Sequence, residues 1–125
     1  MKKIIKTKNA PAPIGPYSQA VLSGNTLYTS GQIAIDPING SLIMETIEVE
    51  TKQVMENMKA VLTEAGMTFE HVIKASIFIS DMDNFSKINE VYNQYFSSNY
   101  PARETVQVVR LPKDVNVEIS MIAVK

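Results

Sequence analysis

The segment Pro101-Ala102-Arg103-Glu104-Thr105-Val106 combines a rigid corner with the side chain best suited to hold a carboxylate. A guanidinium presents a planar fork of donors that binds a carboxylate through two hydrogen bonds, and it stays charged at physiological pH. Side chains two positions apart on a strand share a face, so Arg103 and Thr105 are predicted to project together. Glu118 comes near them if the last two strands of the chain pair.

An ion pair is the competing interpretation of this arginine. Arg103 could pair with Glu118 across two strands, or with its neighbour Glu104. Because ion pairs are common in proteins and binding sites are few, the residues alone favour a structural ion pair.

The usual sequence signatures of catalysis are absent. There is no glycine-rich phosphate loop, no nucleophile elbow and no cysteine, which excludes thiolate chemistry, disulfides and cysteine-ligated zinc. His71 is the only histidine, so no histidine pair can hold a metal, and its place at a strand entrance is typical of a turn or surface residue. A net charge of −1 argues against nucleic acid or an anionic membrane as the main partner.

The chain length fits a single domain, residues 1–125, without an internal repeat or linker. Near the start, only two apolar residues separate Lys3 from Lys6, which is too few for a signal peptide. No later apolar run is long enough to span a membrane. We therefore expect a cytoplasmic protein.

Hydrophobic periodicity places the candidate residues on alternating strands and helices. The predicted strands are 18–22 and 26–35 around a turn at 23–25, a short strand at 41–44, and then 71–79, 105–109 and 115–124. A helix is predicted from residue 46 to 65, with Gly66 as its C-terminal cap. Asp81 or Asp83 caps a second helix that ends before Pro101. The apolar stripe of that helix is Phe85, Ile88, Val91, Tyr92, Tyr95 and Phe96, which we interpret as core.

This order of elements predicts an α+β fold with two helices on one face of a mixed sheet. On the last strand, the face that suits the helices is Val115, Val117, Ile119, Met121 and Ala123. Its other face is mixed, as is the face made by Thr26, Tyr28, Ser30, Gln32 and Ala34. A sheet face of mixed polarity without covering helices favours a subunit interface, so we expect an oligomer.

Five ordered motifs across residues 13–119 resemble the Rid (YjgF-type) family. The first two are Pro13-Ile14-Gly15-Pro16-Tyr17-Ser18-Gln19-Ala20 and Tyr28-Thr29-Ser30-Gly31-Gln32-Ile33. Residues 57–66 and 89–96 resemble the two helices of the family. Pro101-Ala102-Arg103, followed by residues 111–114 and 117–119, is similar to its C-terminal signature.

The resemblance implies a chorismate-mutase-like fold assembled as a homotrimer with clefts between subunits. It also implies an enzyme that hydrolyses 2-imino acids, such as 2-iminopropanoate and 2-iminobutanoate, to 2-keto acids and ammonia, without metal or cofactor. Such imines are released by pyridoxal-phosphate dehydratases. By the same resemblance, Arg103 binds the substrate carboxylate, the backbone amides of Gly31 and Thr105 hold the ligand, and Glu118 positions water. Tyr17, Ser30 and Glu118 line the cleft.

Two positions depart from the pattern of the family. Thr105 stands where the family often has cysteine, which removes any thiol-based control but keeps the backbone N–H. Ser120 stands where a second glutamate is frequent, while Glu118 is retained.

The reaction expected of these residues needs only a small lowering of the activation barrier, since such imines hydrolyse without an enzyme. Water adds to the C=N carbon, with Arg103 fixing that carbon and Glu118, which we expect to stay ionised beside the arginine, orienting or deprotonating the water. Two candidates have structural interpretations of similar weight: Tyr17 as a packing aromatic, and Gly31 as a position of close backbone approach.

Two other functions compete with deamination. A regulatory protein could use the same arginine cleft to bind a 2-keto acid without turnover. RNA cleavage, also claimed for relatives, is disfavoured because the chain has neither a histidine pair nor a basic stripe.

Overall fold

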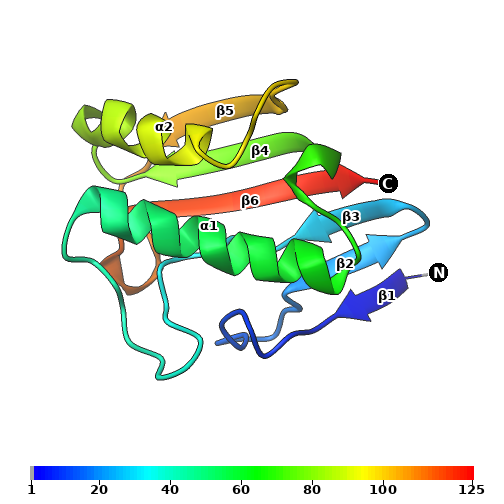
Figure 1. Cartoon of the computed structure of the whole chain (residues 1–125). Helices are drawn as coiled ribbons and strands as arrows, with labels where there is room; N and C mark the ends of the chain where they lie inside the picture. The colour runs from blue at the N-terminus through cyan, green and yellow to red at the C-terminus, as the bar shows by residue number, and fades with distance from the viewer. Residues whose placement is uncertain (1) are drawn as a thin grey trace.

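The computed structural model describes residues 2–125, which form one six-stranded sheet with two α-helices packed on one of its faces (Figure 1). The strands are β1 (Lys2–Ile5), β2 (Ala20–Ser23), β3 (Thr26–Thr29), β4 (Val72–Ile79), β5 (Ala102–Gln107) and β6 (Val117–Val124). The helices are α1 (Ile47–Glu64) and α2 (Phe85–Asn93), and three short 3₁₀ turns are η1 (Phe69–His71), η2 (Met82–Asn84) and η3 (Pro112–Asp114). The order across the sheet is β1-β2-β3-β6-β4-β5, and only the β4–β5 pair is parallel. The predicted α+β class is therefore confirmed.

The last two strands of the chain do not pair, so the condition under which Glu118 would come near Arg103 within one chain is not met. β6 lies between β3 and β4, antiparallel to both, while β5 lies outside β4 at the sheet edge. The cause is the connection through α2: a helix that links two parallel strands returns the chain beside the strand it left. β4 consequently separates Arg103 on β5 from Glu118 on β6.

The first hairpin is confirmed, but its second strand is shorter than predicted. β3 ends at Thr29, and residues 30–35 keep only single bridges to other segments, Gln32 to Ile119 and Ile35 to Leu42. The predicted strand at 41–44 is reduced to that second bridge. Since the alternation of faces lapses after residue 29, Gln32 and Ala34 are buried, contrary to the prediction that they lie on the mixed face.

β1 is an element that the sequence pattern did not predict. It pairs antiparallel with β2 over its whole length, yet only Ile5 in it is buried. One buried side chain gives no period-two pattern, so this edge strand depends on backbone pairing with its neighbour.

The helix α1 begins and ends close to its predicted limits. Thr46 caps its start by accepting a hydrogen bond from Val49 N, and Gly66 follows its end with a positive φ of 73°. Its buried side includes Val54, Met58, Val61 and Leu62, which pack on the sheet.

The helix α2 is shorter than predicted at both ends. Asp81 caps the 3₁₀ turn η2 rather than the helix, and α2 ends at Asn93, before Tyr95 and Phe96. These two aromatic residues nevertheless pack against the main core with Phe69, so they are part of the core, as predicted, although they follow the helix.

The face of β6 that was predicted for the helices is buried throughout, from Val115 to Ala123 at every second residue. Within residues 2–125, the opposite face of the sheet carries no helix (Figure 1). On it, Tyr28 is 52% exposed and Val106 is 40% exposed, with Ile122 half-buried between β3 and β4. We refer to this side as the uncovered face. No helix within residues 2–125 is long and apolar enough to cross a membrane.

Candidate active site

A small cleft on the uncovered face brings together four of the residues selected from the sequence. Its volume is about 280 Å³, and it is lined by Ile14, Tyr17, Ser30, Gly31, Ile33, Pro112 and Glu118. We call it the Glu118 cleft. Three of its walls come from loops and one from β6, so its shape depends on how those loops are fixed.

The proline-rich loop that carries Tyr17 is held by the side chain of Gln19. Gln19 is 2% exposed, and both the oxygen and the nitrogen of its side-chain amide bond to the backbone of the loop. Its Oε1 accepts from Thr7 N at 2.7 Å, and its Nε2 donates to the carbonyls of Thr7, Ala10 and Pro11. The hydroxyl of Tyr17 accepts from Ile14 N at 3.2 Å, which leaves the proton of that hydroxyl free to donate.

Ser30 and Gly31 are fixed by the strand they follow. Ser30 donates its N–H to Gln19 O at 2.9 Å and its hydroxyl to Ser18 O at 2.6 Å. A Cβ on Gly31 would lie 2.0 Å from Glu118 Oε2 and 2.9 Å from Glu118 Cγ, so only glycine lets the carboxylate approach the backbone there. The Gly31 N–H donates to none of the described residues.

Glu118 is half-buried, and the loss of water around its carboxyl group raises its pKa above the ordinary value. Within one chain no arginine contacts Glu118, so the expectation that an adjacent arginine keeps it ionised applies only where a second chain supplies Arg103. A carboxyl group with a raised pKa is a stronger base once ionised.

Arg103 lies at the edge of the helix-covered face, not on the uncovered one. It stands opposite Ala75 in β4, and its Nη1 donates to Asn89 Oδ1 of α2 at 2.8 Å. Its guanidinium also lies over the rings of Tyr92 and Phe85, with centroid distances of 5.1 and 5.8 Å. The guanidinium is thus oriented by three side chains of one helix.

The open space beside Arg103 measures about 500 Å³ and is lined by Asn89, Tyr92, Asn93, Tyr100, Pro101 and Arg103. Burial raises the pKa of Tyr92 to about 12, although the charge of Arg103 acts in the opposite direction. The Tyr92 hydroxyl has no hydrogen-bond partner within the described chain. Tyr92 is therefore core, as predicted, and in addition a neighbour of the arginine.

Neither ion pair considered for Arg103 forms. Glu104 bonds instead to the Ser76 hydroxyl and to Lys74 Nζ at 3.0 Å, and these contacts, the serine first, hold the pKa of Glu104 below its ordinary value. Arg103 consequently keeps part of its donor fork free.

Thr105 shares the face of Arg103, as strand parity predicted. Val108 donates its backbone N–H to Ile79 O, across the β4–β5 pair. Because backbone N–H groups point to alternate sides along a strand, the N–H of Val106 also faces β4, whereas that of Thr105 faces the open edge of the sheet. The Thr105 Oγ1 is buried and has no hydrogen-bond partner among residues 2–125. The backbone of Thr105 is thus free to bind a ligand or another chain.

The six selected residues therefore fall into two groups on opposite faces of the sheet. Arg103 and Thr105 lie on the helix-covered side of the β5 edge, whereas the Glu118 cleft holds Tyr17, Ser30, Gly31 and Glu118. One substrate can touch both groups only if a second chain supplies one of them.

Residue types alone missed three contributors to these groups. Asn89, Gln19 and Pro112 were noted only within motifs, and their signal was weak because amides and prolines are common on surfaces. His71 has the turn role predicted for it: its Nδ1 accepts from Thr68 N at 2.9 Å and closes a capping box.

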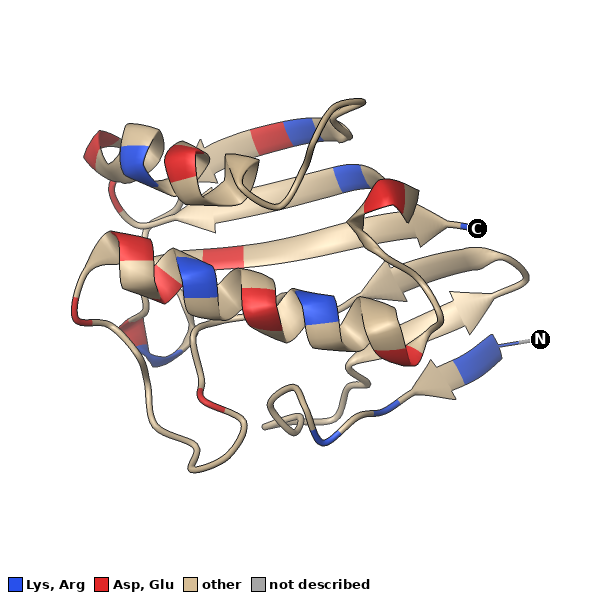
Figure 2. Ribbon diagram, viewed as in Figure 1, with Lys and Arg blue, Asp and Glu red and all other residues tan. Residues whose placement is uncertain are grey.

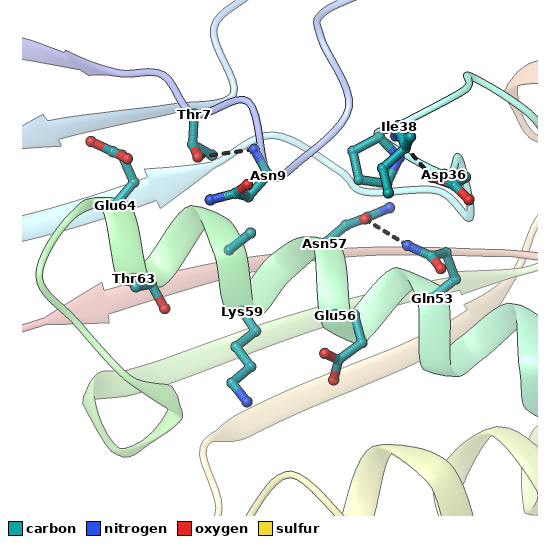
Figure 3. A pocket seen from close by; sticks show the side chains of 12 residues that line it. Thr7, Asn9, Asp36, Ile38, Gln53, Glu56, Asn57, Lys59, Thr63 and Glu64 are labelled. Carbon is teal, nitrogen blue, oxygen red and sulfur yellow. Dashed lines mark hydrogen bonds between the residues drawn. The ribbon is translucent and has the colours of Figure 1, made fainter.

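A larger hollow lies away from both groups, between α1 and the loops at residues 7–9 and 36–38 (Figure 3). Its volume is about 620 Å³. Its buried amide, Asn57, already donates to the carbonyls of Ile33 and Ile35 and accepts from Gln53. Because these polar atoms are satisfied, we assign the hollow no chemistry. No group of three potential metal-binding side chains occurs in the part of the chain that the structure describes.

Residues 7–125 match the family model described as endoribonuclease L-PSP. The chain is 52% identical, over 125 residues, to a RutC family protein of Pyrococcus horikoshii, covering 100% of this chain and 99% of that protein. It is 48% identical over 125 residues to the 2-iminobutanoate/2-iminopropanoate deaminase of Bos taurus, covering 100% of this chain and 91% of that enzyme. A crystal structure of a conserved Rid family protein from Yersinia pestis superposes with a TM-score of 0.97 at 48% identity, covering 100% of both chains.

Proposed function

The chain belongs to the Rid (YjgF, endoribonuclease L-PSP) family, and from that membership we propose that it hydrolyses reactive 2-imino acids to 2-keto acids and ammonia. The similarity to a mammalian enzyme named for this reaction supports the proposal. The proposed substrates are 2-iminopropanoate and 2-iminobutanoate, the imines that pyridoxal-phosphate dehydratases release.

The oriented guanidinium of Arg103 is the observation that carries the proposal. Asn89 holds one of its nitrogens, and the rings of Tyr92 and Phe85 fix its plane. The remaining donors form a fork that matches a carboxylate, and holding that group fixes the neighbouring C=N carbon in space.

We propose that the working site forms between chains of a homotrimer. The unpaired edge of β5 then lies against the Glu118 cleft of a neighbouring chain, so that Arg103 and Thr105 N–H of one subunit meet Tyr17, Gly31 and Glu118 of the next. The exposed apolar side chains of the uncovered face support such an assembly.

In the proposed reaction, Arg103 holds the substrate carboxylate, and the N–H groups of Gly31 and Thr105 donate to the polar intermediate. Glu118 accepts a proton from water as the water oxygen bonds to the carbon of the protonated imine, which forms a neutral carbinolamine. Glu118 returns that proton to the nitrogen and then takes the proton of the carbinolamine hydroxyl, so that the C=O bond forms as the C–N bond breaks. Ammonia leaves as ammonium after it takes this last proton, and the 2-keto acid follows. In the single chain, burial raises the pKa of Glu118, which favours a group that both takes up and returns a proton.

A 2-keto acid binding protein remains the second candidate, because the same fork and cleft suit the product of the reaction. Turnover separates the two functions, since a binding protein saturates with ligand and releases no ammonia.

The overall charge distribution does not favour RNA as a substrate, despite the description of the family. Acidic and basic residues are interspersed along α1 and occur side by side on β5, whereas β1 and the loop after it carry basic residues alone (Figure 2). Phosphate binding rewards a continuous basic surface, and any RNA binding by this chain should fall only slightly with added salt.

The test of the proposal is a coupled assay. A serine/threonine dehydratase generates the imine, semicarbazide competes for it, and the rate of semicarbazone formation is followed with and without this protein. We expect the wild-type chain to suppress trapping and Arg103→Ala to lose at least about tenfold in kcat/KM, which corresponds to ~1.4 kcal/mol of transition-state binding. Lys59→Ala, which removes an exposed cation from α1, is the matched control and should behave as wild type.

Unchanged trapping with the wild-type protein would argue against deamination of these substrates and favour the binding protein. Suppression by both wild type and Arg103→Ala would retain the activity but remove Arg103 from it.

A further inference from the structure

The loop before β6 contains two consecutive non-glycine residues in the left-handed region of backbone conformation. Lys113 has a φ of 56° and Asp114 a φ of 58°. A Cβ makes this conformation unfavourable, so two such residues in succession persist only where their surroundings impose them. We call residues 113–114 the left-handed turn.

Contacts on both sides of the left-handed turn impose its shape. Leu111 and Val115, which flank it, are buried in a small apolar cluster with Ile33 and Ile35. Asp114 N donates to Leu111 O at 3.0 Å, which closes the turn within the backbone.

An arginine clamps the left-handed turn from outside. Arg110 binds both carboxylate oxygens of Asp114, with Nε to Oδ1 at 2.5 Å and Nη2 to Oδ2 at 3.1 Å. The ion pair is exposed, so it contributes little buried surface; its effect is to link residue 110, before the turn, to residue 114 within it.

The residue that the left-handed turn presents is Pro112. It lines the Glu118 cleft together with the aliphatic side chains of Ile14 and Ile33. Its ring is rigid and apolar, and it is the one member of the cleft supplied by this loop. A change in the φ of residue 113 would swing the proline with respect to Glu118.

Beyond the turn, the chain is fixed again before it reaches Glu118. Asn116 donates its N–H and its side-chain amide to the buried carboxylate of Glu50, at 2.8 Å each. The position of Glu118 is therefore set by β6 and Glu50, while that of Pro112 is set by the left-handed turn.

We propose that Pro112 limits the length of the substrate side chain and that the left-handed turn is the positioning element that holds it in place. This inference rests on the proposed function. The Glu118 cleft measures about 280 Å³, and its aliphatic lining consists of Ile14, Ile33 and Pro112, so these are the residues against which the side chain of an imino acid held beside Glu118 would pack. Short aliphatic side chains fit against this wall, and longer ones meet the proline ring.

The experiment compares kcat/KM for imines of increasing side-chain length. An L-amino-acid oxidase generates them from alanine, 2-aminobutyrate, norvaline and leucine, and semicarbazide competition reports each rate. The variants are Pro112→Ala, which removes the ring, and the matched pair Lys113→Val and Lys113→Gly, which both remove the same exposed side chain. Valine disfavours a positive φ, whereas glycine adopts it freely.

Pro112→Ala and Lys113→Val should raise the ratio of kcat/KM for the leucine-derived imine over that for the alanine-derived imine by about five- to tenfold. Lys113→Gly should keep the wild-type ratio within about twofold. Circular dichroism of each variant controls for folding, and if Lys113→Val does not fold, the comparison of Pro112→Ala with Lys113→Gly decides.

An unchanged ratio in Pro112→Ala would overturn the inference, as would a loss of rate equal for every imine, which a structural role alone would produce. If Pro112→Ala and Lys113→Gly both raised the kcat/KM ratio, Pro112 would keep its proposed role, but the left-handed turn would not be the element that positions it. If the wild-type protein accelerates none of the imines, the proposed function itself fails and the inference fails with it.

Discussion

Glu118 is a side chain through which pH acts on the stability of this protein. Burial raises its pKa in the folded chain, so the folded state binds its proton more tightly than the unfolded state does. The carboxyl group is therefore most compatible with folding when it is protonated, and stability is lost as the pH rises from the ordinary glutamate range through the raised pKa.

Glu118→Gln should accordingly be more stable than wild type at neutral pH, by at most about 1 kcal/mol because solvent still reaches the group. The gain should vanish as the pH falls below the ordinary glutamate pKa, where both chains are neutral at this position. Thermal unfolding between pH 4 and pH 8 measures the difference, and the proposed deaminase activity should be lost at every pH.

A stability difference that grew on acidification would contradict this account, since it would mean that the folded chain stabilises the ionised form. Glu104→Gln provides a control with the opposite sign, because Ser76 and Lys74 lower the pKa of that carboxyl group.

At the scale of elements, hydrophobic periodicity predicted those helices and strands that bury one side completely. The alternation of β4 and β6 and the stripe of α1 were readable because one side of each is fully buried. β1 was not predicted because it buries a single side chain. The strand predicted for residues 26–35 was too long, because residues 30–35 include apolar side chains although the regular hydrogen bonding of β3 ends at Thr29.

The spatial relation of Arg103 to Glu118 could not be predicted from local pattern. It depends on β6 inserting between β3 and β4, which is a matter of long-range pairing that no window of residues encodes. Strand parity did predict that Arg103 and Thr105 share a face, because that relation is local to β5.

The proline-rich loop should depend on one amide. Gln19→Glu would turn a carboxylate oxygen toward the three carbonyls that now accept from Nε2, and each would lose its donor. We expect a loss of about 2–3 kcal/mol in the free energy of unfolding, measured by urea denaturation. Gln94→Glu, at an exposed position after α2, should change it by less than about 0.5 kcal/mol. Equal losses in the two variants would contradict the role given to Gln19.

At the scale of the whole molecule, the uncovered face is the surface through which we propose that chains assemble. Exposed apolar side chains lie on the same face as the Glu118 cleft, and the open edge of β5 borders that face. Val106→Lys places a charge on this face, and we expect it to reduce the molar mass measured by light scattering while leaving the circular dichroism spectrum unchanged.

Ile38→Lys is the matched control, because Ile38 is 93% exposed but lies in a loop outside the sheet, so its charge should leave the mass unaltered. A wild-type chain that is monomeric at micromolar concentration, or a Val106→Lys variant of unaltered mass, would argue against assembly through the uncovered face.

The division of the candidate site between two faces of one sheet links catalysis to mass action. If Arg103 and Glu118 must come from different chains, specific activity falls on dilution below the dissociation constant of the assembly, although every chain keeps its fold. The cell's concentration of this protein then acts as a control on its rate, and an isolated newly made chain stays inactive until it meets its partners.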